Sequence, residues 1–347
     1  MRVLIAPDCF TGSLSAAEVA QAIGDGWRRS APRDTLDPAP LSDGGPGFLD
    51  VLAGVGGALV PVTVADPLGR PVPATLLTRG PVAYVESAQA CGLHLLAVGE
   101  RDPERTSTAG VGMLLRAALD AGATRIVVGL GGSGTNDGGR GALQELGADV
   151  DRLRAVDLVV ATDVDNPLLG PDGATAVFGP QKGADPAAMA RLERAMAAYA
   201  STTGTPEHAA AAGAGAAGGL GFALLACGGR RVSGCELVFE EVGLPERVAA
   251  ADLVITGEGR YDAQSARGKV PAGVAALAAA HGTPCVLLAG QIAIGHDQTV
   301  TPGVTEWHGL ADPADPAAVL AAQRDAARLL RQRAARIGAQ WSSAAGH

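Results

Sequence analysis

The sequence lacks the residue patterns of several common kinds of site. Its five cysteines are odd in number and none form a C-x-x-C pair, which argues against a disulfide framework and a structural zinc site. The six histidines are scattered without H-x-x-x-H or H-E-x-x-H spacing, so zinc binding and His-based nucleophilic catalysis have no support. The cysteines are therefore interpreted as small buried groups of a protein in a reducing compartment.

Positive charge and long apolar runs are also scarce. Lys and Arg number 27 against 36 Asp and Glu, a net charge of −9 without a basic block, which argues against general nucleic-acid binding. A small phosphate needs only one local positive site and stays compatible with this balance. The uncharged residues 209–229 are mostly Ala and Gly, and residues 3–6 are too short for a signal peptide. We expect a cytoplasmic protein that binds a small-molecule substrate, with neither nucleic-acid nor membrane partners.

The length and the apolar pattern indicate an α/β protein. A chain of 347 residues with 47% hydrophobic residues predicts two domains, or one large α/β unit, with a sizeable core. Short apolar runs with little alternation are typical of parallel strands buried on both faces. The runs are residues 3–6, 83–86, 125–130, 157–162, 253–256 and 285–289. Helical patterns occupy residues 15–29, 108–121, 141–146, 271–281 and 316–337. This alternation predicts a largely parallel sheet.

Glycine is abundant where ligands of such a sheet bind, in loops that follow strands. In residues 129–139 glycines would let backbone N–H groups approach an anion, Ser133 and Thr135 add donors, and Asp137 could hold Mg²⁺. No Gly-Lys-Ser/Thr follows, so this is not a Walker loop. An ordinary glycine-rich turn is the alternative; the interleaved polar residues favour phosphate contact.

A second loop carries Asp163 and Asp165 directly after a predicted strand. Two carboxylates one residue apart could bind Mg²⁺ or take a proton from an attacking hydroxyl, and an Asx turn is the alternative. Lys182 and Lys269 are the only lysines beside 25 arginines, and both stand in glycine-bearing loops. A compact ammonium suits a phosphate oxygen or a tight turn, although chance placement explains two residues equally well.

Three further polar loops are weak signals when each is taken alone. Residues 8–13, 42–47 and 256–264 place acids near glycines, and the last adds Arg260. A surface turn is the simpler interpretation of each.

Together these strings resemble the bacterial glycerate kinase family, the type that makes 2-phosphoglycerate. The resemblance is carried, in the family's order, by residues 6–16, 42–45, 131–139, 163–168, 178–184, 213–219 and 256–271. It implies dependence on ATP and Mg²⁺, D-glycerate as substrate, and two α/β domains with the active site in the cleft between them. A Rossmann-like parallel-sheet domain would come from both chain ends (residues 1–62 and 235–347), and a mixed α/β domain would be inserted (63–234).

The resemblance leads to a hypothesis for each site residue. Phosphates of ATP would contact Gly131, Gly132, Ser133, Thr135 and Asn136, and Asp165 would orient or deprotonate the substrate hydroxyl. Lys182 and Arg260 are candidates for the transferring phosphate or the glycerate carboxylate. Asp137 and Asp163, with help from Asp43, would hold Mg²⁺. The residues assigned to substrate binding are Asp8, Ser13, Asp43 and Lys269.

The chain also departs from the family's pattern. Thr11 stands where Lys is usual, Pro46-Gly47-Phe48 stands where Glu-Gly-Thr is usual, and family residues are missing between Gly147 and Asp157. Loss of a cation at a phosphoryl-transfer site weakens electrostatic stabilisation. Two alternatives therefore stay open: a kinase for another small hydroxy or sugar acid, and a nucleotide-binding paralogue with weakened catalysis.

Overall fold

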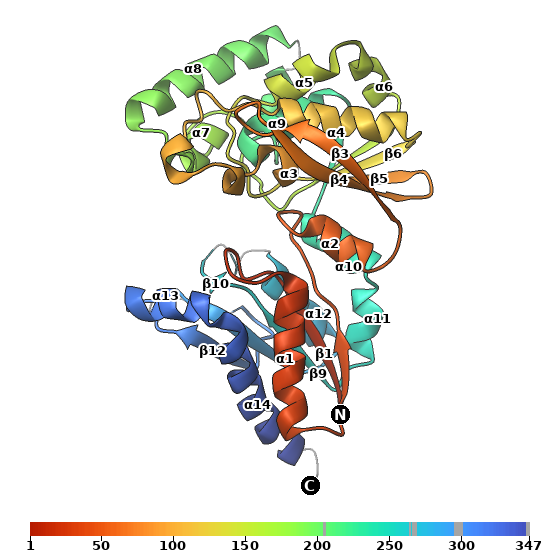
Figure 1. The fold of residues 1–347 in the computed structure, drawn as a ribbon, viewed down its shortest axis with the longest axis vertical. Helices are drawn as coiled ribbons and strands as arrows, with labels where there is room; N and C mark the ends of the chain where they lie inside the picture. Colours follow the sequence, from red (N-terminus) through yellow and green to blue (C-terminus); the bar gives the residue numbers. More distant parts are fainter. Residues whose placement is uncertain (204–205, 264, 266–268, 295–300, 345–347) are drawn as a thin grey trace. The chain divides into compact units, whose positions relative to one another are not determined.

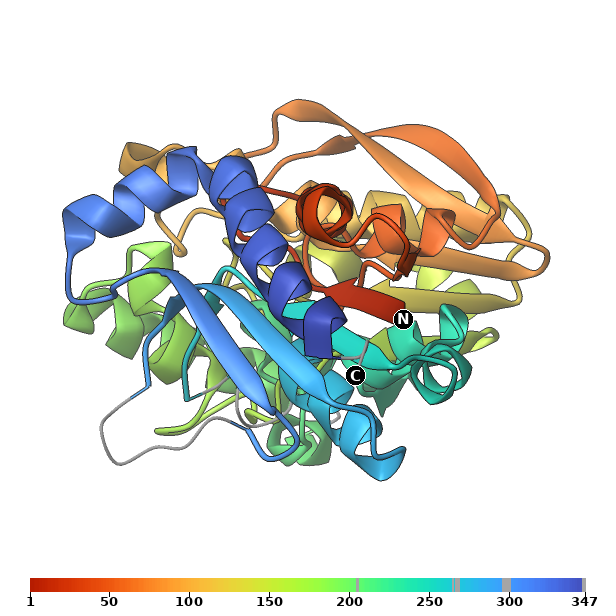
Figure 2. The ribbon, with the colours of Figure 1, turned by 90° about the horizontal axis from the view of Figure 1, so that it is seen from below.

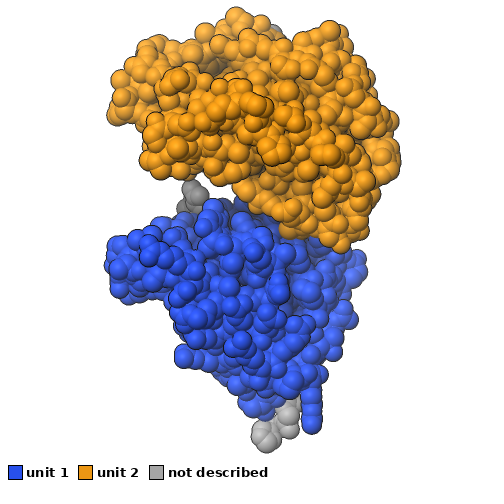
Figure 3. Space-filling model, in the orientation of Figure 1, with its two compact units in different colours: residues 1–43, 235–347 blue, residues 44–234 orange. Residues whose placement is uncertain are grey.

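The chain folds into two compact units. The computed structural model describes residues 1–203, 206–263, 265, 269–294 and 301–344. One unit combines Met1–Asp43 with Cys235–His347, and Gly44–Gly234 form the other (Figure 3). The sequence predicts boundaries after residues 62 and 234, and the compact units divide after Asp43 and Gly234. Both ends of the chain thus build one unit.

The unit made from the two chain ends contains a parallel sheet. Its strands lie in the order β10-β11-β9-β1-β2, with β12 also paired to β11. They are β1 (Arg2–Pro7), β2 (Thr35–Pro38), β9 (Leu253–Gly257), β10 (Arg260–Tyr261), β11 (Cys285–Ile292) and β12 (Glu306–Ala311). Every pairing in this sheet is parallel. The apolar runs predicted as strands at residues 3–6, 253–256 and 285–289 are confirmed, since each lies inside one of these strands.

Two long helices, α1 (Ala16–Ser30) and α14 (Ala326–Ala344), lie side by side and share a core with the sheet (Figures 1 and 2). A capping box of Ser15 and Glu18 begins α1, as the sequence predicts. Gly26 permits the close approach, because a Cβ there would collide with the backbone of Arg331. The single helix predicted over residues 316–337 is wrong: α13 (Pro316–Arg324) ends at Asp325, whose backbone leaves helical geometry before α14 begins.

Further helices in the described residues of this unit are α10 (Gly234–Glu241), α11 (Leu244–Ala249) and α12 (Val270–Ala280). Of these, α12 covers β9 and β11. The helix predicted over residues 271–281 is thereby confirmed. Its Pro271 stands in the first turn, where a missing N–H leaves no hydrogen bond unmade.

The inserted unit contains a mixed sheet in the order β3-β4-β5-β6-β7-β8. The strands are β3 (Ala58–Ala65), β4 (Pro71–Arg79), β5 (Val82–Glu86), β6 (Arg125–Gly129), β7 (Asp157–Ala161) and β8 (Arg230–Val232). Strands β3, β4 and β5 pair antiparallel. Strands β5, β6, β7 and β8 pair parallel. The predictions for β5, β6 and β7 are confirmed, whereas the β3–β4 hairpin was not predicted.

Helices pack around this sheet on a core of buried Leu, Val and Ala side chains. They are α2 (Phe48–Ala53), α3 (Ala88–Cys91), α4 (Ala109–Asp120), α5 (Arg140–Leu146), α6 (Val150–Arg154), α7 (Ala174–Phe178), α8 (Pro186–Thr202) and α9 (Ala216–Ala226). The predicted helices at residues 108–121 and 141–146 correspond to α4 and α5. In the part of the chain that the structure describes, no helix is both long and apolar enough to span a membrane.

Candidate active site

The glycine-rich loop (residues 131–139) follows β6, and the buried side chain of Lys182 holds it through hydrogen bonds. Lys182 is 1% exposed, and its Nζ donates hydrogen bonds to Ser133 Oγ at 3.0 Å and to the Thr135 carbonyl at 2.7 Å. Burial lowers the pKa of this ammonium to about 8, although the neighbouring Cys91 and Asp137 act in the opposite direction. Lys182 therefore places a positive charge in direct contact with Ser133 and Thr135 of the loop.

The loop also contains buried polar atoms without hydrogen-bond partners. Thr135 and Asn136 are 0% and 2% exposed, and Thr135 Oγ1 and Asn136 Oδ1 have no partner. The amide nitrogen of Asn136 is satisfied, because it donates to Thr175 Oγ1 at 2.9 Å. An orphaned buried polar atom is costly and calls for an explanation, of which a ligand or ordered water is the simplest. The sequence prediction of Ser133, Thr135 and Asn136 as one group is consistent with this arrangement.

The carboxylate of Asp137 is hydrogen-bonded to residues at the starts of two helices, α4 and α5. Its carboxylate accepts hydrogen bonds from the backbone N–H groups of Thr108, Gly139 and Gly141, at 2.9 to 3.0 Å. The Thr108 hydroxyl donates to it as well, at 2.8 Å to Oδ2. These donors lie at the beginnings of α4 and α5, where a negative charge is favourable. The arrangement favours an anchoring role for Asp137 over the predicted role in holding Mg²⁺.

The segment 213–219 ties the glycine-rich loop to the loop after β7. Gly215 N donates to the Asn166 carbonyl at 2.9 Å, and Gly138 N donates to the Gly218 carbonyl at 3.0 Å. At Ala217 and Gly218 the backbone is left-handed, with φ of 50° and 67°, a conformation that glycine adopts readily and alanine does not. A Cβ on Gly218 would collide with the Thr135 carbonyl. The small residues of this tract thus permit the glycine-rich loop and the loop after β7 to pack together.

The two acids after β7 have different surroundings. Asp163 accepts a hydrogen bond from Ser233 Oγ at 2.6 Å. The side chain of Asp165 is 78% exposed and pairs with Arg231 Nη2 at 2.7 Å. Because β6 and β7 are neighbouring parallel strands, both acids and the glycine-rich loop emerge from the same sheet edge. The structure brings Ser133, Lys182 and the acid loop together in one unit.

The other unit carries a second polar group, at the carboxyl ends of β1 and β9. Asp8 and Glu258 each follow one of two paired residues, Pro7 and Gly257. The chain runs from β1 to β2 on one side of β1, and β9 lies on the other side, so this is the switch point at which ligands bind in open parallel sheets. Gly259 packs on Phe10, since a Cβ there would lie 3.1 Å from Phe10 Cα. The loops after β1 and β9 therefore meet.

Burial and neighbouring acids raise the pKa of two acids of this group, Asp8 and Glu258. Burial, then Asp43 and Glu258, raise the pKa of Asp8 well above its ordinary value. Glu258 is 6% exposed, its Oε1 has no hydrogen-bond partner, and burial raises its pKa to about 7. Burial would lower the pKa of Lys269, but the surrounding Asp43, Glu258, Asp262 and Asp8 outweigh this and raise it. Among the predicted substrate residues, Asp8, Asp43 and Lys269 thus interact.

The remaining predicted residues of this unit have local partners. Ser13 Oγ donates to the Phe10 carbonyl at 2.9 Å, which closes the turn after β1. Arg260 is 61% exposed and lies 3.5 Å from Asp262. Glu258 was not among the predicted site residues, although an acid directly after a buried strand is the signal that would have identified it. Glu86 at the end of β5 was missed in the same way.

The oxygen-rich donor set suits Mg²⁺, which proteins hold with one or two carboxylates together with substrate phosphates. Within the described ranges, no three His, Cys, Asp or Glu side chains gather as a complete metal cage. In the inserted unit Asp163 is a candidate ligand for the ion, and the Asp137 carboxylate already accepts several hydrogen bonds. Unpartnered Thr135 Oγ1 and Asn136 Oδ1 are compatible with a polar ligand at the loop.

Comparison with known proteins shows what the chain is similar to. A model of the Glycerate kinase family matches residues 3–152 and 149–342. Glycerate kinase of Bacillus subtilis (strain 168) is 43% identical over 329 residues, covering 84% of this chain and 85% of the relative. Glycerate 2-kinase of Escherichia coli (strain K12) is 40% identical over 344 residues, covering 89% of both. A crystal structure from Salmonella typhimurium LT2, provisionally designated glycerate kinase 2, has a TM-score of 0.79 at 37% identity and covers 100% of both chains.

Fold and matches together define a kinase with two α/β units. The two segments matched by the family model meet at residues 149–152, inside the stretch where the sequence predicts missing family residues. The chain belongs to the glycerate kinase family.

Proposed function

We propose that the protein transfers a phosphoryl group from ATP to the 2-hydroxyl of D-glycerate in the presence of Mg²⁺. The observation that carries this proposal is the glycine-rich loop with the buried Lys182 ammonium beneath it, 3.0 Å from Ser133 Oγ. Phosphoryl transfer is catalysed by positioning and charge neutralisation, and this loop supplies both. The 40% identity to a protein named glycerate 2-kinase supports the 2-position.

In this proposal the inserted unit handles the phosphates. Backbone N–H groups of Gly131 and Gly132 and the side chains of Ser133, Thr135 and Asn136 bind phosphate oxygens. Lys182 donates hydrogen bonds to Ser133 and Thr135, so it positions the loop. Its positive charge acts on the phosphates through the field that it creates at the loop. Bound Mg²⁺ would neutralise phosphate charge, and Asp163 is the acid of this unit that would hold it.

Asp165 is the residue we assign to the substrate hydroxyl. Its exposed carboxylate, paired with Arg231, can accept a hydrogen bond from that hydroxyl and orient it. Asp8, Ser13, Asp43 and Lys269 would bind glycerate, with Ser13 shaping the turn after β1, and Arg260 would bind the carboxylate or the transferring phosphate. Lys269 provides the cation beside four acids, Asp43, Glu258, Asp262 and Asp8, so that a hydroxy acid meets both donors and acceptors.

A panel of acceptors tests the proposed substrate. Purified protein with Mg·ATP is offered D-glycerate, L-glycerate, glycolate, D-lactate and a sugar acid, and ADP release is followed. D-glycerate should give the highest kcat/KM. A higher value for another hydroxy or sugar acid would transfer the assignment to that acid, and nucleotide binding without turnover of any acceptor would favour the weakened paralogue.

We further propose that the protein closes over its bound substrates. Closure excludes water and limits idle ATP hydrolysis. Small-angle scattering should therefore change when D-glycerate is added together with a nucleotide, and an unchanged curve would count against closure.

A further inference from the structure

Residues 93–108 form a segment that lies alongside the glycine-rich loop and is hydrogen-bonded to it. Leu93 N donates to the Gly132 carbonyl at 2.8 Å, and Thr106 Oγ1 donates to the Gly134 carbonyl at 3.1 Å. The segment ends at Thr108, which binds Asp137 through both its backbone N–H and its hydroxyl. The position of this segment is therefore coupled to the loop at several points along its length.

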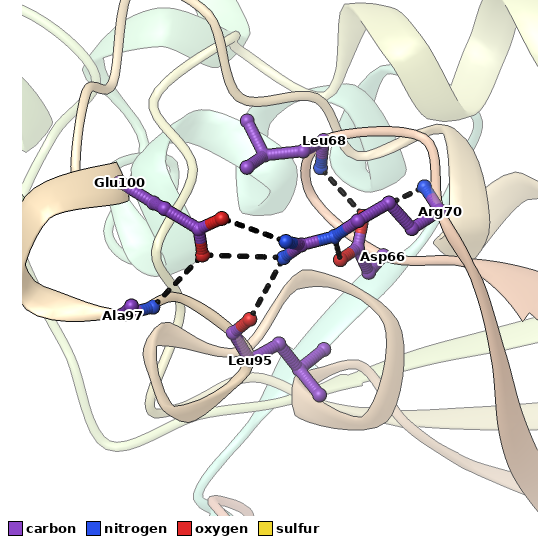
Figure 4. A network of polar contacts seen from close by, with 6 residues as sticks. All are labelled: Asp66, Leu68, Arg70, Leu95, Ala97 and Glu100. Atoms are coloured by element: carbon purple, nitrogen blue, oxygen red, sulfur yellow. Dashed lines mark hydrogen bonds and ion pairs between the residues drawn. The ribbon is translucent and has the colours of Figure 1, made fainter.

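A network around Arg70 fixes the middle of this segment (Figure 4). The guanidinium binds Asp66 through Nε, lies 2.7 Å from Glu100 through Nη1, and donates to the Leu95 carbonyl at 3.2 Å. Asp66 is 3% exposed and also accepts from the backbone of Leu68 and Arg70 at 2.8 and 2.9 Å. Glu100 is held a second time, since it accepts from Ala97 N at 3.0 Å.

Arg101 follows Glu100 directly and has no such partners. Its Nε is buried without a hydrogen bond, and no ion pair to it occurs among the residues that the structure describes. Its main chain packs on Gly183, where a Cβ would collide with the Arg101 carbonyl, and Gly183 follows Lys182 in the chain. The main chain of Arg101 thus lies next to the turn that carries Lys182, whose side chain contacts Ser133.

Arg231 differs from Arg101 because it has a counter-ion. Arg231 Nε is likewise buried without a hydrogen bond, but the same guanidinium pairs with Asp165 through Nη2 at 2.7 Å. A permanent cation with a buried, unsatisfied N–H and no counter-ion is unfavourable, so such a group calls for an explanation. An anionic ligand would supply both the missing acceptor and the missing charge.

We infer that Arg101 binds an anionic oxygen group of a substrate, either a nucleotide phosphate or the glycerate carboxylate. The inference rests on the proposed function and adds a residue that its site lacks. A planar guanidinium offers several N–H donors in fixed geometry, which matches both phosphate and carboxylate. The Arg70–Glu100 network fixes Glu100, the residue that precedes Arg101 in the chain.

Binding of ADP and of D-glycerate, each measured separately by calorimetry, tests this inference without relying on turnover. The variants are Arg101→Met and Arg101→Lys, and the matched control is Arg105→Met, which removes an exposed arginine from the same segment. Arg101→Met should weaken one of the two ligands by at least about tenfold, since hydrogen bonds to charged groups contribute that much. Arg101→Lys should fall between Arg101→Met and wild type, and Arg105→Met should bind like wild type.

The ligand that weakens identifies the source of the anion: ADP indicates phosphate and D-glycerate indicates the carboxylate. Unchanged affinity of Arg101→Met and Arg101→Lys for both ligands would overturn the inference while leaving the proposed function intact. A wild-type protein that binds both ligands but turns over no acceptor would contradict the proposed function, and the Arg101 comparison would still be decided by the affinities. Equal thermal stability of Arg101→Lys and wild type excludes a folding defect as the cause of weaker binding.

Discussion

Lys182 Nζ lies 3.0 Å from Ser133 Oγ, and both groups are buried. These two residues are far apart in the sequence, and their contact joins the one-turn helix Pro180–Lys182 to the glycine-rich loop. The ammonium also donates to the Thr135 carbonyl, so it fixes the loop at two points. These two contacts restrict the backbone of the loop, which in the proposed function binds the phosphates of ATP.

The buried ammonium of Lys182 should show itself in the pH dependence of stability. Its pKa of about 8 lies below the ordinary value of 10.5, so between these pH values the unfolded chain binds more protons than the folded one. Stability conferred by this group therefore rises with pH through that window. Relative to Lys182→Met, wild type should gain about 1–2 kcal/mol in urea unfolding between pH 7.5 and 9.5. Parallel curves for the two proteins would show that the pKa is not lowered.

Glu86 should have the opposite effect in a lower pH range. Burial raises its pKa to about 7 from 4.5, while hydrogen bonds from the backbone of Leu49 and Gly47 act against this. The folded state then binds more protons between pH 4.5 and 7, so stability is lost as the pH rises through this window. Glu86→Gln keeps an acceptor for both N–H groups and should be more stable than wild type by about 1–3 kcal/mol at pH 8.

Near pH 4.5 the difference between Glu86→Gln and wild type should vanish. The control is Glu246→Gln, at an exposed position in α11, which should follow the wild-type pH dependence. A Glu86→Gln variant no more stable than wild type at pH 8 would contradict the raised pKa.

Gly218 should tolerate no side chain. Gly218→Ala adds a Cβ where the Thr135 carbonyl stands, in addition to the strain of a left-handed backbone with φ of 67°. Gly228→Ala is the matched control, because its φ is 89° and nothing lies within 4 Å of the added Cβ. Both variants should lose about 1 kcal/mol from backbone strain, and Gly218→Ala should lose about 1–3 kcal/mol more through the clash. Equal unfolding midpoints for Gly218→Ala and Gly228→Ala would mean that the loop containing Thr135 moves to accommodate the added Cβ at little cost in free energy.

Asp165 should be needed for turnover and not for nucleotide binding. Asp165→Asn keeps the shape and removes the charge, which should lower kcat by about 10²–10⁴-fold if the carboxylate orients or deprotonates the hydroxyl. The control is Asp172→Asn, an exposed position a few residues along the same connection. Unchanged turnover of Asp165→Asn in an ADP-release assay would reject its role.

The strands that carry the site could be predicted because their chemistry is local. Residues 125–130 and 157–162 are continuous apolar runs followed by polar loops, and β6 and β7 occupy them. The β3–β4 hairpin escaped prediction because its strands mix exposed and buried residues and contain prolines, a pattern close to that of a loop. The break at Asp325 was missed since helical periodicity continues across it.

Parts of the site depend on contacts that no local pattern reveals. The sequence suggested Lys182 because lysine is rare, but its position beneath Ser133 follows from the packing of distant segments. Asp137 is predicted as a metal ligand from its place in the glycine-rich loop, and no local pattern reveals that Thr108 donates to its carboxylate. Arg101 could not be selected among 25 arginines, because only the fold shows that its Nε is buried without a hydrogen-bond partner.

The position of the phosphate on the product tests the central claim most directly. Wild-type protein is incubated with Mg·ATP and D-glycerate, and the product is assigned by ³¹P NMR against authentic standards of 2- and 3-phosphoglycerate. We expect 2-phosphoglycerate, formed in equal amount to ADP. Formation of 3-phosphoglycerate, or ADP release without a phosphorylated glycerate, would contradict the proposed reaction.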